Sequence, residues 1–203
     1  MDYSKEFKQA LSAFSPAEKD RLIFRLLKKD KILSQKLYFE LIDPENEDEK
    51  RAKMESFIES EVAAAAKHLR NPKYFLVLIR KISARITEHV KITSDKFGEV
   101  SLNILLVNEV LKHSKSLNDT YKLDMYLLNK IFRLLVLTEK LHPDYFLELK
   151  GGFERLSDQI NSNHQQKKLF VEHGFNLAWL EPEYIPAEIG SIQKELKNKG
   201  FLR

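Results

Sequence analysis

Four side chains in the middle of the sequence could hold a divalent metal ion. Glu109 and His113 are four positions apart and share a helix face, and Glu88-His89 lies on the helix expected before them. Carboxylates and imidazoles on two facing helices are ligands that zinc and manganese accept. The same spacing is typical of a solvated surface pair, and a cation such as His113 is favoured in a last helical turn anyway. We therefore expect a surface pair, with no metal and no cofactor.

Catalytic motifs are missing from the rest of the sequence. The six glycines form neither a phosphate-binding loop nor a dinucleotide fingerprint. No His-Glu-x-x-His sequence, nucleophile elbow or pair of Glu-x-x-His sequences occurs. The sequence has no cysteine, which excludes a disulfide framework, thiolate catalysis and cysteine-ligated metal sites. These absences favour a protein without a catalytic site.

The distribution of charge is the strongest sign of a binding partner. Residues 43–61 are rich in Asp and Glu, whereas residues 67–91 contain seven basic side chains and one acidic one. Lys73, Arg80 and Lys91 fall on one outer stripe of the helix expected there, and Lys81 and Arg85 belong to the same basic segment. Such a stripe can contact nucleic-acid phosphates without reading the base sequence. The alternative is a solvated face that neutralises the acidic helix before it.

Trp179 is the only tryptophan, and it lies in residues 175–186, where no helical period is visible. Aromatic anchors of this kind concentrate in protein interfaces, so Trp179 is a candidate interface residue. The competing interpretation is that the segment folds back and covers the end of its own helical bundle. The sequence leaves both open.

The helix signals predict an all-α fold of about eight helices, either an antiparallel bundle or a short solenoid-like array. We expect a helix content of about 65–80% and essentially no strand. The expected helices cover about residues 3–14, 15–27, 31–42, 47–69, 72–91, 94–113, 119–141 and 143–160. The helix at 119–141 is apolar nearly all round and is expected to be central, while Gly151-Gly152 is expected to loosen the last one.

Two of the N-terminal helices carry apolar stripes that we expect to be buried. The helix at 15–27 presents Leu22, Ile23, Leu26 and Leu27 on one face. The helix at 31–42 is dominated by residues such as Leu37, Tyr38 and Phe39, which we expect in the core. A core role for these residues argues against a DNA-reading helix-turn-helix, because its second helix needs polar side chains that reach base edges.

The division into domains follows from where the helical pattern weakens. We expect a helical domain over residues 1–174 that includes a short helix at 165–173. Residues 175–203 are expected to form an irregular segment and a basic C-terminal helix, which pack on this domain or extend it. No apolar run reaches the length of a membrane helix, and the charged N-terminus is not a signal peptide. A cytoplasmic protein without a membrane partner is therefore expected.

Five stretches within residues 11–46 and 138–156 are similar to known proteins, namely residues 11–27, 36–39, 43–46, 138–146 and 153–156. In them the sequence resembles a family of bacterial all-helical proteins known only as a domain of unknown function. The chain departs from the family in lacking a basic, glycine-containing segment after the fourth helix. The resemblance implies a helical fold and a bacterial origin, and it implies no activity.

The sequence as a whole favours a non-enzymatic interaction or scaffold protein, with another protein or a second copy as its partner. The alternative is a nucleic-acid-associated protein that uses the basic face of Lys73, Arg80 and Lys91.

Overall fold

The computed structural model describes residues 2–115, 117 and 120–202. The chain is 79% helical, with ten α-helices and no strand in these residues. The predicted all-α class and helix content are therefore confirmed, and the number of helices is slightly higher than expected. None of the described helices is both long enough and apolar enough to cross a membrane.

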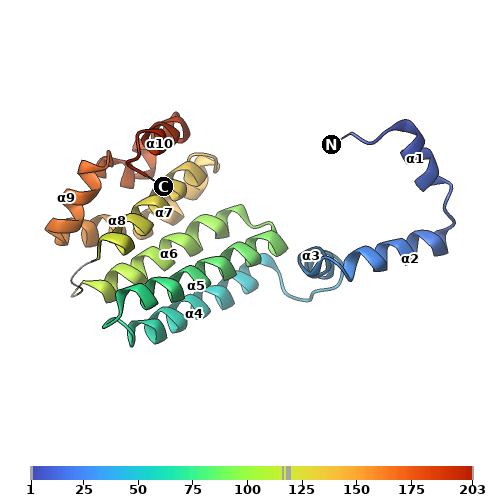
Figure 1. The fold of residues 1–203 in the computed structure, drawn as a ribbon, viewed down its shortest axis with the longest axis horizontal. Coiled ribbons are helices and arrows are strands. Elements are labelled where there is room, and N and C mark those ends of the chain that lie inside the picture. Colours follow the sequence, from blue (N-terminus) through green and yellow to red (C-terminus); the bar gives the residue numbers. More distant parts are fainter. Residues whose placement is uncertain (1, 116, 118–119, 203) are drawn as a thin grey trace. The chain divides into compact units, whose positions relative to one another are not determined.

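The ten helices follow one another along the chain with short connections, except for residues 173–188 between the last two helices (Figure 1). They are α1 (Lys5–Ser12), α2 (Pro16–Leu27), α3 (Lys31–Leu41), α4 (Glu47–Ala66), α5 (Pro72–Thr93), α6 (Lys96–Ser114), α7 (Tyr121–Thr138), α8 (Phe146–Ser162), α9 (His164–Glu172) and α10 (Ile189–Asn198). Short 3-10 turns lie at Pro143–Tyr145, Leu177–Leu180 and Pro182–Tyr184. The connection between the helices expected at 94–113 and 119–141, and the expected start of the second at residue 119, fall partly outside the described residues.

Most helix starts are set by the side chains that the sequence suggests. Ser15 and Glu18 form a reciprocal capping box at α2, and Asn46 and Glu49 form another at α4. The start of α6 differs from the prediction: its N-cap is Asp95, whose Oδ1 accepts a 2.7 Å hydrogen bond from the Gly98 amide. Ser94 instead ends α5, with a left-handed φ of 60°.

The described chain divides into two compact units. The first comprises residues 2–45 with 91–93, and the second comprises residues 46–90 and 94–202. The expected boundary at residue 174 does not coincide with this division, because residues 175–202 belong to the second unit. That C-terminal stretch places Phe175, Leu180 and Ile189 in the core of the second unit.

The core of the second unit is built around α6, which packs against α4, α7 and α8. Figure 1 shows α4, α5 and α6 side by side, with α7 next to α6. The helix expected at 119–141 is α7, and it is deeply buried, as its all-round apolar character predicts, since Leu127, Ile131 and Phe132 are fully buried. It packs on α6 and α10 and contacts α5, so α7 shares the centre of this core with α6.

A glycine sets the closest approach between α6 and α8. A Cβ atom on Gly152 would lie 2.8 Å from Cγ2 of Ile104, so any larger residue would push the helices apart. At the same level, Asn108 Nδ2 donates a 2.9 Å hydrogen bond to the Gly152 carbonyl oxygen. Gly152 therefore serves packing, and α8 runs through the Gly151-Gly152 pair without the expected loosening.

The first unit contradicts the predicted burial of its apolar stripes. None of the residues of α1, α2 or α3 is buried. Ile23 and Leu26 are 47% and 50% exposed, and Tyr38 is 54% exposed. The amphipathic pattern was real, but these helices form no core of their own.

Candidate functional site

A groove between α5 and α7 is the largest of the hollows described on the second unit, with a volume of about 1120 Å³. Its basic side chains are Arg70, Lys73, Arg80 and Lys122, and no carboxylate from the described part of the chain lines it. Tyr121 and Tyr126 add aromatic surface, and Leu76 and Val77 contribute to its apolar floor. The groove therefore combines positive charge with aromatic and apolar area.

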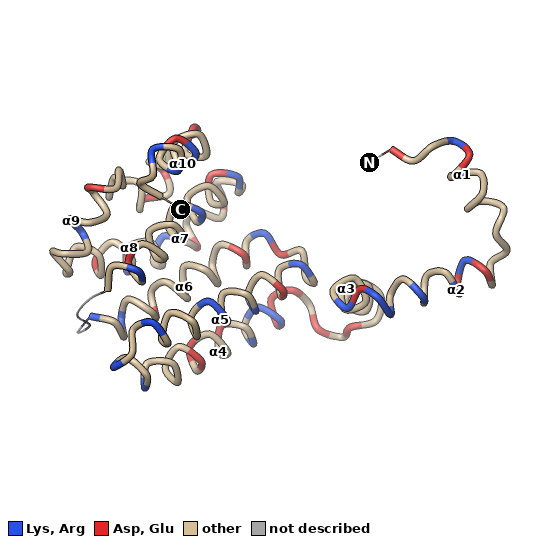
Figure 2. The backbone as a smooth tube through the Cα atoms, viewed as in Figure 1, with Lys and Arg blue, Asp and Glu red and all other residues tan. Residues whose placement is uncertain are grey.

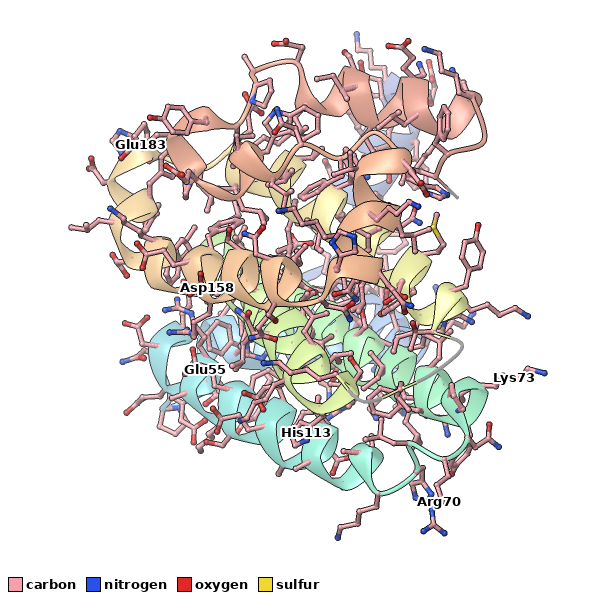
Figure 3. All side chains as sticks on the ribbon, turned by 90° about the vertical axis from the view of Figure 1, so that its left-hand side faces the viewer. Glu55, Arg70, Lys73, His113, Asp158 and Glu183 are labelled. Atoms are coloured by element: carbon pink, nitrogen blue, oxygen red, sulfur yellow. The ribbon has the colours of Figure 1, made fainter. Side chains whose placement is uncertain are left out.

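The periodicity of α5 places two of these cations in line. Lys73 and Arg80 are seven residues apart, which is nearly two turns, and Leu76 and Val77 lie between them on the same side of the helix. Phe75 and Ile79 point the other way and are fully buried, which fixes the rotation of α5. In Figure 3 Lys73 extends outward from the end of α5, with Arg70 close to the same end of the molecule.

The opposite wall comes from the first two turns of α7. Leu123 and Met125 are buried, whereas Tyr121 is 50% exposed at the rim. The guanidinium of Arg80 lies 5.6 Å from the centre of the Tyr126 ring, a cation–π contact that joins the two walls. This contact holds Arg80 across the groove.

The other basic residues predicted from the sequence lie elsewhere. Lys81 and Arg85 line a second hollow of about 340 Å³ between α4 and α5, together with Glu61. Arg85 also forms a 2.8 Å ion pair with Glu88. Lys91 is exposed on the last turn of α5 and belongs to the first unit. Lys and Arg recur along α5 in Figure 2, but only Lys73 and Arg80 of the predicted set line the basic groove.

A polar cluster that the sequence analysis missed lies one helical turn beyond Arg80 and Tyr126. The Lys130 amine of α7 donates a 2.7 Å hydrogen bond to the Ser83 hydroxyl of α5. Burial, and secondarily the charge of Arg133, lowers the pKa of Lys130 to about 8. Burial also raises the pKa of Tyr126, against the opposing effects of its hydrogen bond with Ser83 and the charge of Arg80.

A signal for this cluster was present in the sequence. Lys130, together with Asn129, interrupts an apolar run between Leu128 and Ile131, and Tyr126 precedes Lys130 by four residues, on the same helix face. A lysine inside such a run is a candidate buried charge, because lysine is seldom buried without a reason. Its partner Ser83 has no comparable signal.

The candidate metal ligands form ordinary contacts. The Glu109 carboxylate lies 3.1 Å from Lys112 Nζ and 3.8 Å from His113 Nε2. Glu88 pairs with Arg85, while His89 is buried and burial lowers its pKa. Within residues 2–115, 117 and 120–202, no three His, Cys, Asp or Glu side chains gather as a metal site would require.

Trp179 packs on its own unit. Its ring contacts Phe132 and Phe175 edge-on, at centroid distances of 6.1 and 6.0 Å. Leu180 and Pro182 are buried beside it. In the arrangement described, residues 175–186 thus fold back onto their own helices, and Trp179 is half-buried there.

Comparison of the chain with protein-family models, with curated proteins and with solved structures found no match. The side chains of the groove, the polar cluster and the first unit therefore carry the functional argument.

Proposed function

We propose that the chain is a non-enzymatic interaction protein that pairs with a second copy through helices α1 to α3. The observation that carries this proposal is the set of large apolar side chains left exposed in residues 2–45. They are 39–76% exposed and comprise Tyr3, Phe7, Phe14, Ile23, Phe24, Leu26, Leu33, Tyr38, Leu41 and Ile42. A cytoplasmic location and kinship with bacterial helical proteins remain predictions.

Physical chemistry requires a cover for these helices. Isolated helices shorter than about 12–15 residues are marginal in water, so most of the stability of α1 to α3 has to come from packing. Their apolar stripes offer about 1,000 Å² in total, if each large side chain contributes half of its roughly 200 Å². A standard interface buries about 800 Å² on each partner, so the area suffices for a stable complex.

A second copy is the occupant that the composition of the segment favours. Residues 2–45 contain nine basic and eight acidic side chains, so two copies meet without strong repulsion. In an isologous dimer, helices α1 to α3 of each copy pack against the same helices of the other copy, so each apolar stripe is covered by an identical stripe. The chain needs no further component to cover these side chains.

Analytical ultracentrifugation of the full chain tests this proposal. We expect a monomer–dimer equilibrium with a Kd of about 10 µM or tighter, and Leu26→Asp should weaken it at least tenfold because it buries a carboxylate. Arg21→Gln is the matched control, since it changes the net charge by the same amount as Leu26→Asp but on the polar side of α2. It should leave dimerisation unchanged. A monomer at about 100 µM would refute self-association, as would a Leu26→Asp variant that dimerises normally.

We propose, as a second candidate function, that the groove between α5 and α7 binds single-stranded nucleic acid. The specific observation in its favour is the combination of four cations with two tyrosines and no carboxylate. Proteins that hold single strands without sequence preference use a positive groove and aromatic side chains on which bases stack. Tyr121, half-exposed at the rim, offers such a face.

The groove sets the expected strength and salt dependence of this binding. Lys73 and Arg80 lie about 10 Å apart along the helix axis, so the four cations can reach about three or four phosphates. For single strands the log–log slope of affinity against salt is then about −2 to −3.

Fluorescence anisotropy with labelled oligonucleotides at low salt measures this binding. Lys73→Glu with Arg80→Glu should weaken binding at least tenfold, because both side chains line the groove. Lys81→Glu with Arg85→Glu makes the same charge change on the same helix but faces the other hollow, so it should have a much smaller effect. Equal losses in the two double variants would show that only overall charge matters, and no binding at tens of micromolar protein would remove the second candidate.

A further inference from the structure

We propose that Arg80, Ser83, Tyr126 and Lys130 form a subsite for a terminal phosphate group, adjoining the groove between α5 and α7. This inference rests on the second proposed function and specifies which part of a nucleic acid the groove favours. Arg80 and Tyr126 line the groove itself. Ser83 lies three residues after Arg80 on α5, and Lys130 lies four residues after Tyr126 on α7, so these two side chains lie one turn beyond the groove-lining residues of the same two helices.

The first argument is the incomplete pairing of Lys130. Its ammonium group has three donors, and Ser83 Oγ is its one hydrogen-bond acceptor in the described residues. The side chain is partly buried, and this burial lowers its pKa to about 8. A partly buried cation with unused donors destabilises the free protein, and an anion bound next to it reduces that penalty.

The second argument is the local balance of charge. Arg80, Lys130 and Arg133 are basic, and Glu99 is the acid that acts on Lys130. Glu99 forms a 3.0 Å ion pair with Arg133, and no carboxylate of the described residues forms an ion pair with Arg80 or Lys130. A terminal phosphate carries a charge of about −1.5 to −2 at pH 7, whereas a phosphodiester carries −1. The excess of two cations therefore matches a terminal phosphate better than an internal one.

The third argument is the supply of donors. A phosphate monoester presents three strongly accepting oxygens. The ammonium of Lys130, the guanidinium of Arg80 and the hydroxyls of Ser83 and Tyr126 are all able to donate to them. Tyr121 at the rim is placed to stack on a base of the same strand. The ligand is thus a strand end that carries a phosphate.

The test compares one labelled oligonucleotide with and without a 5′-phosphate, with the label at the 3′ end. The full chain should bind the phosphorylated strand at least fivefold more tightly. Lys130→Met should abolish this preference and leave the affinity for the unphosphorylated strand unchanged. The matched control is Lys122→Met, which removes a groove cation on the same helix and should weaken both strands by the same factor.

Each outcome decides the inference. Equal affinity of the wild-type chain for the two strands overturns the subsite and leaves nucleic-acid binding standing, and a preference that survives in Lys130→Met also overturns the subsite. Failure of both strands to bind overturns the second proposed function together with this inference. Pyrophosphate tests whether a free phosphate ligand binds at the same place. A rise in the Tm of the wild-type chain that Lys130→Met abolishes supports the phosphate subsite. Competition between pyrophosphate and the phosphorylated strand shows whether the two ligands share it.

Discussion

The two units of this chain have equally good local helix signals but differ in how far their helices are buried. The helix α2 starts with a capping box at Ser15, and α4 starts with one at Asn46. Yet α2 has no buried residue, whereas α4 buries Ile58 and Val62 completely. Capping and periodicity specify that a segment is helical and which side is apolar. They do not specify what covers that side.

The largest test of this contrast removes one aromatic ring from each unit. Phe132→Ala should lower the free energy of unfolding by about 3–5 kcal/mol, because Phe132 is fully buried between Phe175 and Trp179. Phe24→Ala should cost less than about 0.5 kcal/mol, because that ring is 63% exposed. Urea denaturation of dilute, monomeric protein measures both. Comparable losses would show that α2 has a core partner after all.

The next test uses buried charge, which distinguishes Lys130 of the second unit from exposed lysines such as Lys28 of the first. The pKa of Lys130 falls from 10.5 to about 8 on folding, so the unfolded chain binds more protons between these pH values. Stability should therefore rise as the pH increases from about 8 to about 10.5, and the full penalty applies at pH 7. Lys130→Met should raise the free energy of unfolding at pH 7 by up to about 3 kcal/mol.

The control for this prediction is Lys28→Met, which removes an exposed cation and should leave the free energy of unfolding nearly unchanged. Denaturation curves at pH 7 and pH 10.5 are the measurement, and the advantage of Lys130→Met should shrink at the higher pH. An advantage that is independent of pH would mean that the methionine acts through packing alone.

The smallest effect compares the two capping boxes directly. Asn46→Ala should cost about 1 kcal/mol of global stability, because the start of α4 is coupled to the core. Ser15→Ala should leave global unfolding unchanged and lower only the amide-exchange protection of α2. Hydrogen exchange by mass spectrometry resolves the two helices. A global effect of Ser15→Ala would contradict the separation of the two units.

Much of the helical framework was predictable, because capping side chains and prolines mark most helix starts and act locally. Ser94 was misread because Ser and Asp are both good N-caps, and Asp95 followed it directly. The burial of α2 and α3 was predicted wrongly because an amphipathic stripe indicates a need for cover without showing where the cover is. The central position of α6 depends on contacts with helices far apart in the sequence, which periodicity does not encode.

The candidate site was only half visible in the sequence for a related reason. Periodicity aligned Lys73 with Arg80, and both line the groove. Lys81 and Arg85 were grouped with them because a count of charges ignores direction. Lys122 and the Ser83–Lys130 hydrogen bond depend on α7 lying against α5, some 47 residues away along the chain. The groove is a property of that pairing.

The glycine contact between α6 and α8 has a mechanical consequence. Sliding one helix past the other by a turn, about 5.4 Å, would place Gly152 against a different side chain and break its hydrogen bond with Asn108. The register of this helix pair is therefore fixed at one position, and the hydrogen bond from Gln159 Nε2 to Asn108 Oδ1 also favours that register. Any ratchet motion that accompanies ligand binding in the second unit has to occur at a different helix pair.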